Sequence, residues 1–128
     1  MKIVLDTNAY SDWRQTGRWN ETIATASEVL IPAIVLGELR YGFQGAARGP
    51  ENEANLLRFL ADPVVRVLDV GDATSRSYAV LKHFLRRAGT PIPENDVWIS
   101  AIAVEHLASL VTSDGHLDCL PQVTRVTE

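Results

Sequence analysis

The chain has 128 residues, of which 46% are hydrophobic and 22% are charged, which is typical of one globular domain with a single core. No apolar run approaches the roughly 20 residues of a membrane-spanning helix, so we expect no membrane association. The net charge of −4 argues against a uniformly basic surface but does not exclude nucleic acid as a partner. We expect one domain over residues 1–128 in the cytoplasm, because the first strand leaves no room for a signal peptide.

Short apolar runs alternate with segments of helical periodicity along the chain. Strands are predicted over residues 2–5, 29–31, 64–70, 109–112 and 123–126. Helices are predicted over residues 9–25, 33–44, 52–61, 72–88 and 97–107. This alternation predicts an α/β fold in which helices cover both faces of a central, mostly parallel sheet.

The first predicted helix is polar and aromatic, and it places Trp13 and Trp19 close to Arg14 and Arg18. Such a set could stack bases and hold phosphates. Aromatic residues of this kind more often pack a helix against the core or against a second subunit. We therefore favour packing for both tryptophans.

Two predicted strands end abruptly in an aspartate. Asp6 follows the first strand and precedes Thr7 and Asn8, and Asp114 follows the fourth strand. Ligands of open parallel sheets bind just beyond the carboxyl ends of the strands, so both carboxylates would face one crevice. Asp6 or Asn8 could instead simply cap the helix that follows, which these residue types do well.

Two more carboxylates lie on predicted helices. Glu38 shares a helix face with Val35 and Tyr41, where a carboxylate is costly to desolvate unless a cation or a hydrogen-bond donor meets it. A metal ion would meet it better than Arg40, because residues two positions apart do not share a helix face. Asp96 lies in the first turn of a mostly apolar helix, where it either binds a metal or only stabilises the helix dipole.

Four carboxylates in one crevice would raise one another's pKa unless cations neutralise them. Mg²⁺ suits such a site, because it binds a few carboxylates and retains several waters. The common use of this arrangement is phosphoryl transfer, in which metal ions stabilise the attacking and leaving oxygens. The sequence has no Walker glycine loop, no G-x-G-x-x-G and no H-E-x-x-H motif, so the carboxylates favour a nuclease.

Four short motifs carry these carboxylates and follow one another without a large insertion. They are Asp6-Thr7-Asn8, Leu36-Gly37-Glu38-Leu39, Asp96 at the start of an apolar helix, and Thr112-Ser113-Asp114 before Asp118. Over essentially the whole chain, this ordered set resembles the PIN-domain ribonucleases and, among them, the VapC toxins of prokaryotic toxin–antitoxin pairs. The resemblance implies a PIN-like three-layer α/β/α sandwich, a Mg²⁺- or Mn²⁺-dependent endoribonuclease that cleaves RNA, a homodimer, and inhibition by a cognate antitoxin.

The resemblance also implies roles for individual residues. The residues that match the family's acidic catalytic and metal-binding positions are Asp6, Glu38, Asp96 and Asp114. The residues that match supporting positions are Thr7, Asn8, Thr112 and Asp118. The segment 114–118 is one residue longer than the commoner family pattern, which leaves open whether Asp114 or Asp118 is the nearer ligand.

Other classes of protein remain open at this point. A Mg²⁺-dependent phosphatase of the haloacid-dehalogenase type needs a second Asp two residues after the first, where this chain has Asn8. A receiver domain needs a Lys after a late strand, and none is visible. A PIN-like module without activity would only bind RNA or protein, and the presence of all four acids argues against it.

Overall fold

A computed structural model gives the fold of the chain, and the structure is described for residues 1–126. Five strands form one sheet in the order β3-β2-β1-β4-β5. They are β1 (Lys2–Leu5), β2 (Glu28–Pro32), β3 (Val65–Leu68), β4 (Ser109–Val111) and β5 (Arg125–Val126). Every neighbouring pair of strands is parallel, so the sheet that the sequence predicts is confirmed.

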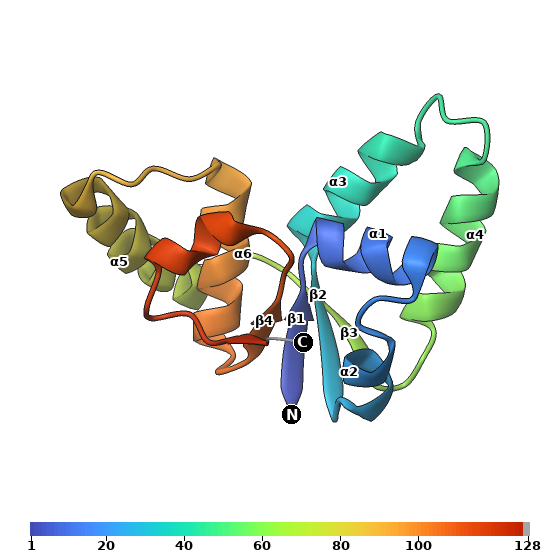
Figure 1. Cartoon of the computed structure of the whole chain (residues 1–128), viewed down its shortest axis with the longest axis horizontal. Coiled ribbons are helices and arrows are strands. Elements are labelled where there is room, and N and C mark those ends of the chain that lie inside the picture. The colour runs from blue at the N-terminus through green and yellow to red at the C-terminus, as the bar shows by residue number, and fades with distance from the viewer. Residues whose placement is uncertain (127–128) are drawn as a thin grey trace.

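Helices cover both faces of this sheet. They are α1 (Thr7–Thr16), α2 (Asn20–Thr25), α3 (Ala33–Phe43), α4 (Gly49–Leu60), α5 (Asp72–Ala88), α6 (Glu94–Glu105) and the short 3₁₀ helix η1 (Gly115–Cys119). Figure 1 shows α5 and α6 on one side of the strands and α1 to α4 on the other. The molecule is therefore the three-layer α/β/α sandwich that the motifs indicate. No helix in residues 1–126 is long and apolar enough to cross a membrane.

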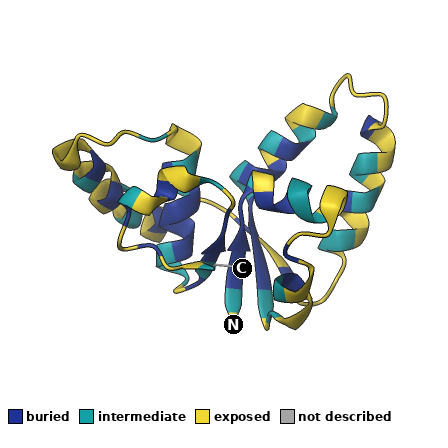
Figure 2. Ribbon diagram, viewed as in Figure 1, coloured by how far each residue is buried: buried dark blue, intermediate teal, exposed yellow. Residues whose placement is uncertain are grey.

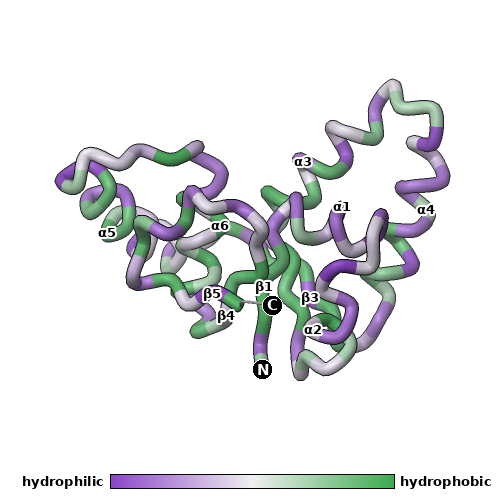
Figure 3. The backbone as a smooth tube through the Cα atoms, in the orientation of Figure 1, coloured by the Kyte–Doolittle hydropathy of each residue, from purple (hydrophilic) through white to green (hydrophobic). Residues whose placement is uncertain are grey.

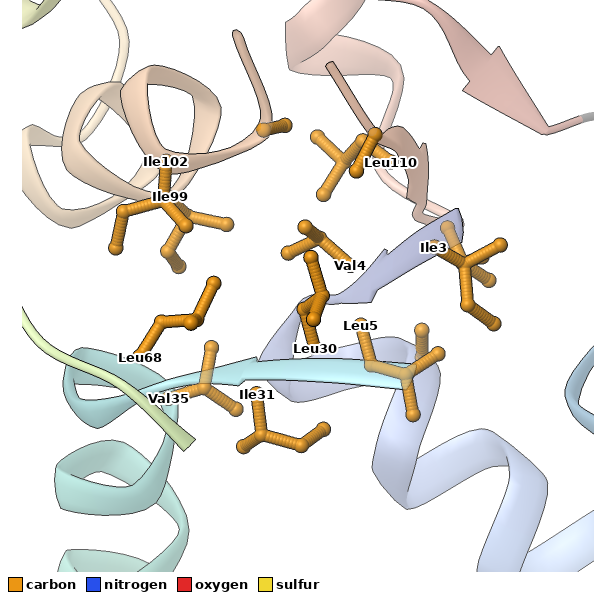
Figure 4. Packing of buried hydrophobic residues seen from close by; sticks show 14 of the residues in the cluster. Ile3, Val4, Leu5, Leu30, Ile31, Val35, Leu68, Ile99, Ile102 and Leu110 are labelled. Carbon is orange, nitrogen blue, oxygen red and sulfur yellow. The ribbon is translucent and has the colours of Figure 1, made fainter. Parts of the chain in front are cut away.

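The core lies on both faces of the central strands, which are mostly buried (Figure 2) and mostly hydrophobic (Figure 3). Neighbouring residues of a strand point to opposite faces, and both Leu30 and Ile31 of β2 are buried. Figure 4 shows Leu30 on the side of Ile99 and Ile102 from α6, whereas Ile31 points the other way. Burying each such side chain contributes about 1.5 to 3 kcal/mol, and it holds α6 firmly against the sheet.

The segment 9–25 differs from the single helix that its pattern predicts. Gly17 has φ +78° and ends α1, and α2 begins only at Asn20. The predicted packing of the two tryptophans is confirmed. The ring centroid of Trp13 lies 5.1 Å from that of Phe59 on α4, and Trp19 is only 5% exposed.

Two strands bring their carboxyl ends to the same place. In the register of β1 and β4, Leu5 pairs with Val111, so Asp6 and Thr112 follow at the same edge of the sheet. The helix α3 also begins at this edge, directly after β2 ends at Pro32. The strand ends thus place the start of α1, the start of α3 and the loop after β4 around one space.

Candidate active site

A cleft of about 450 Å³ opens at the carboxyl edge of the sheet. The residues that line it come from the ends of β1 and β4, from α3 and from the start of α6. They are Asp6, Thr7, Asn8, Glu38, Pro93, Glu94, Asn95, Asp96 and Asp114. The structure therefore brings together the four acids that the sequence predicts for one site.

Asp6 both caps a helix and faces this cleft. Its Oδ1 accepts a hydrogen bond of 2.8 Å from the backbone N–H of Ala9, which makes it the N-cap of α1. Burial raises the pKa of Asp6 from its ordinary 3.8 to about 6, and the charges of Asp96 and Asp114 add to this effect. Hydrogen bonds with Thr112 and Ala9 lower the pKa but do not offset the burial. The two roles that the sequence left open for Asp6 are thus compatible.

Asp96 and Asp114 both line the cleft and repel each other electrostatically. Burial raises the pKa of Asp96, and the nearby charges of Asp114 and Glu38 raise it further. Asp114 caps η1 by accepting a hydrogen bond of 2.9 Å from the N–H of His116. Its own N–H donates to the hydroxyl of Thr112 over 3.0 Å. Thr112 therefore bonds to Asp6 and to the backbone of Asp114, and links the two strand ends.

Polar side chains from two helices orient the carboxylate of Glu38. The hydroxyl of Thr7 donates to its Oε1 over 2.6 Å, and the amide of Asn95 donates to its Oε2 over 3.4 Å. Of the two apolar neighbours predicted on its helix face, Val35 is buried, whereas Tyr41 is 83% exposed. Arg40 is no partner of Glu38, since its guanidinium bonds to Glu53 over 3.0 Å. Glu38 is held towards the cleft without a cation.

Sequence reasoning missed Glu94 and Asn95, which also line the cleft. Both precede Asp96 at the start of a helix, where polar residues are expected as part of the helix terminus in any case. Glu94 differs from the other acids because both of its oxygens are occupied. The hydroxyl of Tyr78 donates to Oε1, and the ammonium of Lys82 lies 2.7 Å from Oε2. These bonds hold the pKa of Glu94 below its ordinary value.

The two aspartates of segment 114–118 occupy different surroundings. Asp114 lines the cleft, whereas Asp118 has a side chain that is 67% exposed and forms an ion pair with Arg125. Arg125 belongs to the edge strand β5. The structure thus places Asp114 nearer than Asp118 to the other three acids.

The donor set of the cleft fits a hard divalent cation. Among residues 1–126, no three His, Cys, Asp or Glu side chains stand close enough to enclose a metal ion. Mg²⁺ does not need such a cage, because it retains several waters and binds one or two carboxylates directly. The carboxylate of Asp96 has no hydrogen bond or ion pair within the described residues, and it faces other negative charges. A divalent cation would relieve this repulsion.

The family profile of the PIN domain matches residues 3–121. The chain therefore belongs to the PIN-domain family, in agreement with its parallel sheet and its acidic cleft. Its relatives in that family are VapC proteins, as the sequence motifs indicate. Ribonuclease VapC4 of Mycobacterium tuberculosis is 35% identical over 98 residues, which cover 76% of this chain and 75% of the relative.

Solved structures agree with this assignment. The VapBC2 complex of Rickettsia felis, bound to a DNA fragment from their promoter, contains a chain with a TM-score of 0.86 and 26% identity. That match covers 98% of both chains. The VapBC-5 toxin–antitoxin structure from Mycobacterium tuberculosis matches with a TM-score of 0.77 and 26% identity, again over 98% of both chains.

Proposed function

We propose that this protein is a metal-dependent endoribonuclease that acts as the toxin of a toxin–antitoxin pair in the cytoplasm. The observation that carries the proposal is the convergence of Asp6, Glu38, Asp96 and Asp114 on one cleft from four separate segments. The ribonuclease names of the sequence relatives support RNA as the substrate. The VapBC complexes among the similar structures support a cognate antitoxin as the partner.

Asp6, Asp96, Asp114 and Glu38 would hold Mg²⁺ or Mn²⁺ in this cleft. A divalent cation held by these residues would supply Lewis acidity towards the phosphodiester and would favour ionisation of the attacking water. Hydrolysis then adds one water across a P–O bond, and the leaving oxygen takes up a proton.

The chain's own residues prepare the cleft for this reaction. Thr7 and Asn95 orient the carboxylate of Glu38, and Thr112 links the ends of β1 and β4. Asp6 has a pKa of about 6, so it is ionised and able to bind a cation at neutral pH. The buried end of β1 fixes Asp6 in place, which keeps its orientation constant while substrate binds.

Substitution of the cleft acids tests this proposal. Asp6→Asn, Glu38→Gln and Asp96→Asn should each lower the rate of RNA cleavage at least about a hundredfold, because even supporting residues of metal sites contribute 10- to 100-fold. Glu21→Gln is the matched control, since Glu21 is exposed on α2 at the other end of the sheet (Figure 1). Cleavage at the wild-type rate by all three cleft variants would refute the proposed site.

A homodimer is also part of the proposal, because the family resemblance implies one. Light scattering coupled to size-exclusion chromatography measures the mass in solution. A mass twice that of the chain is expected, and a mass of 14.1 kDa at all concentrations would contradict it.

A further inference from the structure

One cation stands at the wall of the acidic cleft. Lys82 on α5 lies 2.7 Å from Oε2 of Glu94, the first residue of α6, and Glu94 lines the cleft. Within residues 1–126, no other Lys or Arg forms an ion pair with a residue that lines the cleft. The side chain of Lys82 remains 45% exposed, so its ammonium is accessible to a ligand.

Two aromatic residues fix this part of α5 against α6. Tyr78 lies one helical turn before Lys82, and its hydroxyl donates to the other oxygen of Glu94. Its ring stacks on that of Trp98 from α6, with centroids 3.9 Å apart and an angle of 13° between the planes. Glu94 thus holds the ammonium of Lys82 at the start of α6. Glu94 itself lies two residues before Asp96 in the sequence.

The acidic cleft would repel the phosphates of RNA, and the ammonium of Lys82 could attract one of them. An RNA strand with its scissile phosphate at Asp6 and Asp96 would bring its flanking phosphates close to a wall that is otherwise acidic. A metal ion among the carboxylates neutralises charge locally, but it does not reach phosphates further along the strand. A Lys ammonium has three donors, and Glu94 accepts from only one of them. Lysine commonly binds phosphate as a point charge.

We propose that Lys82 binds a backbone phosphate of the RNA next to the scissile bond, and that Glu94 and Tyr78 position it for this contact. This inference rests on the proposed ribonuclease function and adds a substrate-binding residue to it. Lys82 acts on the binding of the RNA strand and takes no part in the hydrolysis. Its removal should therefore affect KM and leave kcat nearly unchanged.

Steady-state cleavage of a short single-stranded RNA of mixed sequence, in Mg²⁺, tests the inference. Lys82→Met should raise KM about tenfold, the effect of one charge-assisted hydrogen bond. Lys82→Arg should restore KM, because it retains the charge. The slope of log kcat/KM against log salt should become shallower by about 0.7 in Lys82→Met, the value for one phosphate contact with a single strand.

Two further variants separate phosphate binding from a purely structural role. Glu94→Gln removes the negative charge next to the cation, but its amide oxygen can still accept a hydrogen bond from the ammonium of Lys82 and keep it in position, so KM should stay equal or fall. If Lys82 serves only to hold Glu94, Lys82→Met and Glu94→Gln will raise KM alike, and the inference is overturned. Arg87→Met on the same helix is the matched control for loss of one positive charge, and it should leave both KM and the salt slope at the wild-type values.

Equal KM and equal salt slope in Lys82→Met and Arg87→Met would also overturn the inference, while cleavage by the wild type would leave the ribonuclease function in place. Failure of the wild type to cleave RNA in both Mg²⁺ and Mn²⁺ would refute the ribonuclease function, and the inference with it. The variants should fold, because exposed ion pairs contribute little to stability. Thermal melting of each protein verifies this.

Discussion

The buried carboxylate of Asp6 has two roles, because it caps a helix and also faces the cleft. One oxygen caps α1 through the N–H of Ala9, while burial and the neighbouring Asp96 and Asp114 disfavour the ionised form. Asparagine at this position keeps a carbonyl oxygen for the cap and removes only the charge. Asp6→Asn therefore separates the electrostatic role of this residue from its role in folding.

The stability of the metal-free protein should depend on pH through Asp6. Its pKa is raised from 3.8 to about 6, so between these values the folded protein binds a proton more tightly than the unfolded chain. The free energy of unfolding should fall by up to about 3 kcal/mol as the pH rises through this window, and remain lower above it. Asp6→Asn should lack this component, which urea unfolding of both proteins at a series of pH values measures. If the free energy of unfolding of the wild type and of Asp6→Asn depends on pH in the same way, the pKa of Asp6 is not raised in the folded protein.

Asp114 and Asp118 should respond differently to the same substitution. Asp114 lines the cleft, whereas Asp118 is exposed and pairs with Arg125. Asp114→Asn should abolish RNA cleavage and weaken Mn²⁺ binding, whereas Asp118→Asn should leave both close to the wild type. Calorimetric titration with Mn²⁺ and a cleavage assay compare the two variants. Loss of Mn²⁺ binding in Asp118→Asn alone would make Asp118 the ligand.

At the scale of elements, the sequence predicts those features that depend on local pattern. The strand over residues 2–5 is found with the predicted bounds, because a short apolar run followed by Asp6 has few other interpretations. The break at Gly17 was missed, because helical periodicity continues through a single glycine. The turn includes Trp19, which has φ +71° and is buried in the core, and local periodicity does not predict this tertiary contact.

The surroundings of Glu38 and Glu94 could not be predicted for a different reason. Periodicity identifies which residues share a helix face, but it does not say which element that face contacts. The bond from Thr7 to Glu38 joins α1 to α3, and the bonds from Tyr78 and Lys82 to Glu94 join α5 to α6. Each depends on tertiary packing between segments that are distant in the sequence.

The C-terminal ends of α5 and α6 offer a matched test of backbone strain. Both helices end in a left-handed residue, which is Gly89 with φ +69° after α5 and Leu107 with φ +53° after α6. Leu107 is 91% exposed, so its side chain contributes little packing. Leu107→Gly should raise the free energy of unfolding by up to about 1 kcal/mol, and Gly89→Ala should lower it by about 1 kcal/mol. Urea denaturation measures the free energy of unfolding of both variants. If both substitutions lower it, the backbone at Leu107 is not strained.

At the scale of the whole molecule, the parallel sheet decides which charges meet. The strands β1 and β4 are adjacent, although more than a hundred residues separate them in the sequence, and their ends place Asp6 and Asp114 in one cleft. The core on both faces of the sheet fixes these strand ends. The repulsion among the acids is thus built into the fold, and a cation or a cationic partner can relieve it.

A cognate antitoxin should compete with metal for this cleft. An Arg of the antitoxin could pair with the carboxylates through two parallel hydrogen bonds, in the place of the metal ion. By linkage, Mg²⁺ should weaken antitoxin affinity by the same factor by which the antitoxin weakens Mg²⁺ affinity. Titration calorimetry at several Mg²⁺ concentrations and constant ionic strength measures this factor. An antitoxin affinity that is independent of Mg²⁺ and unchanged in Asp96→Asn would place its main contact elsewhere, for example along the segment of Trp13 and Trp19.

The central claim is that the four carboxylates bind a metal ion and that the protein needs this ion to cleave RNA. Its most direct test is cleavage of RNA by the wild-type protein in Mg²⁺, followed by addition of EDTA and then of excess Mg²⁺ to the same sample. Because the acids need the ion for the reaction, cleavage should stop with EDTA and resume with Mg²⁺, and Asp6→Asn should be inactive throughout while remaining folded. Undiminished cleavage in EDTA would contradict a metal-dependent reaction at this cleft.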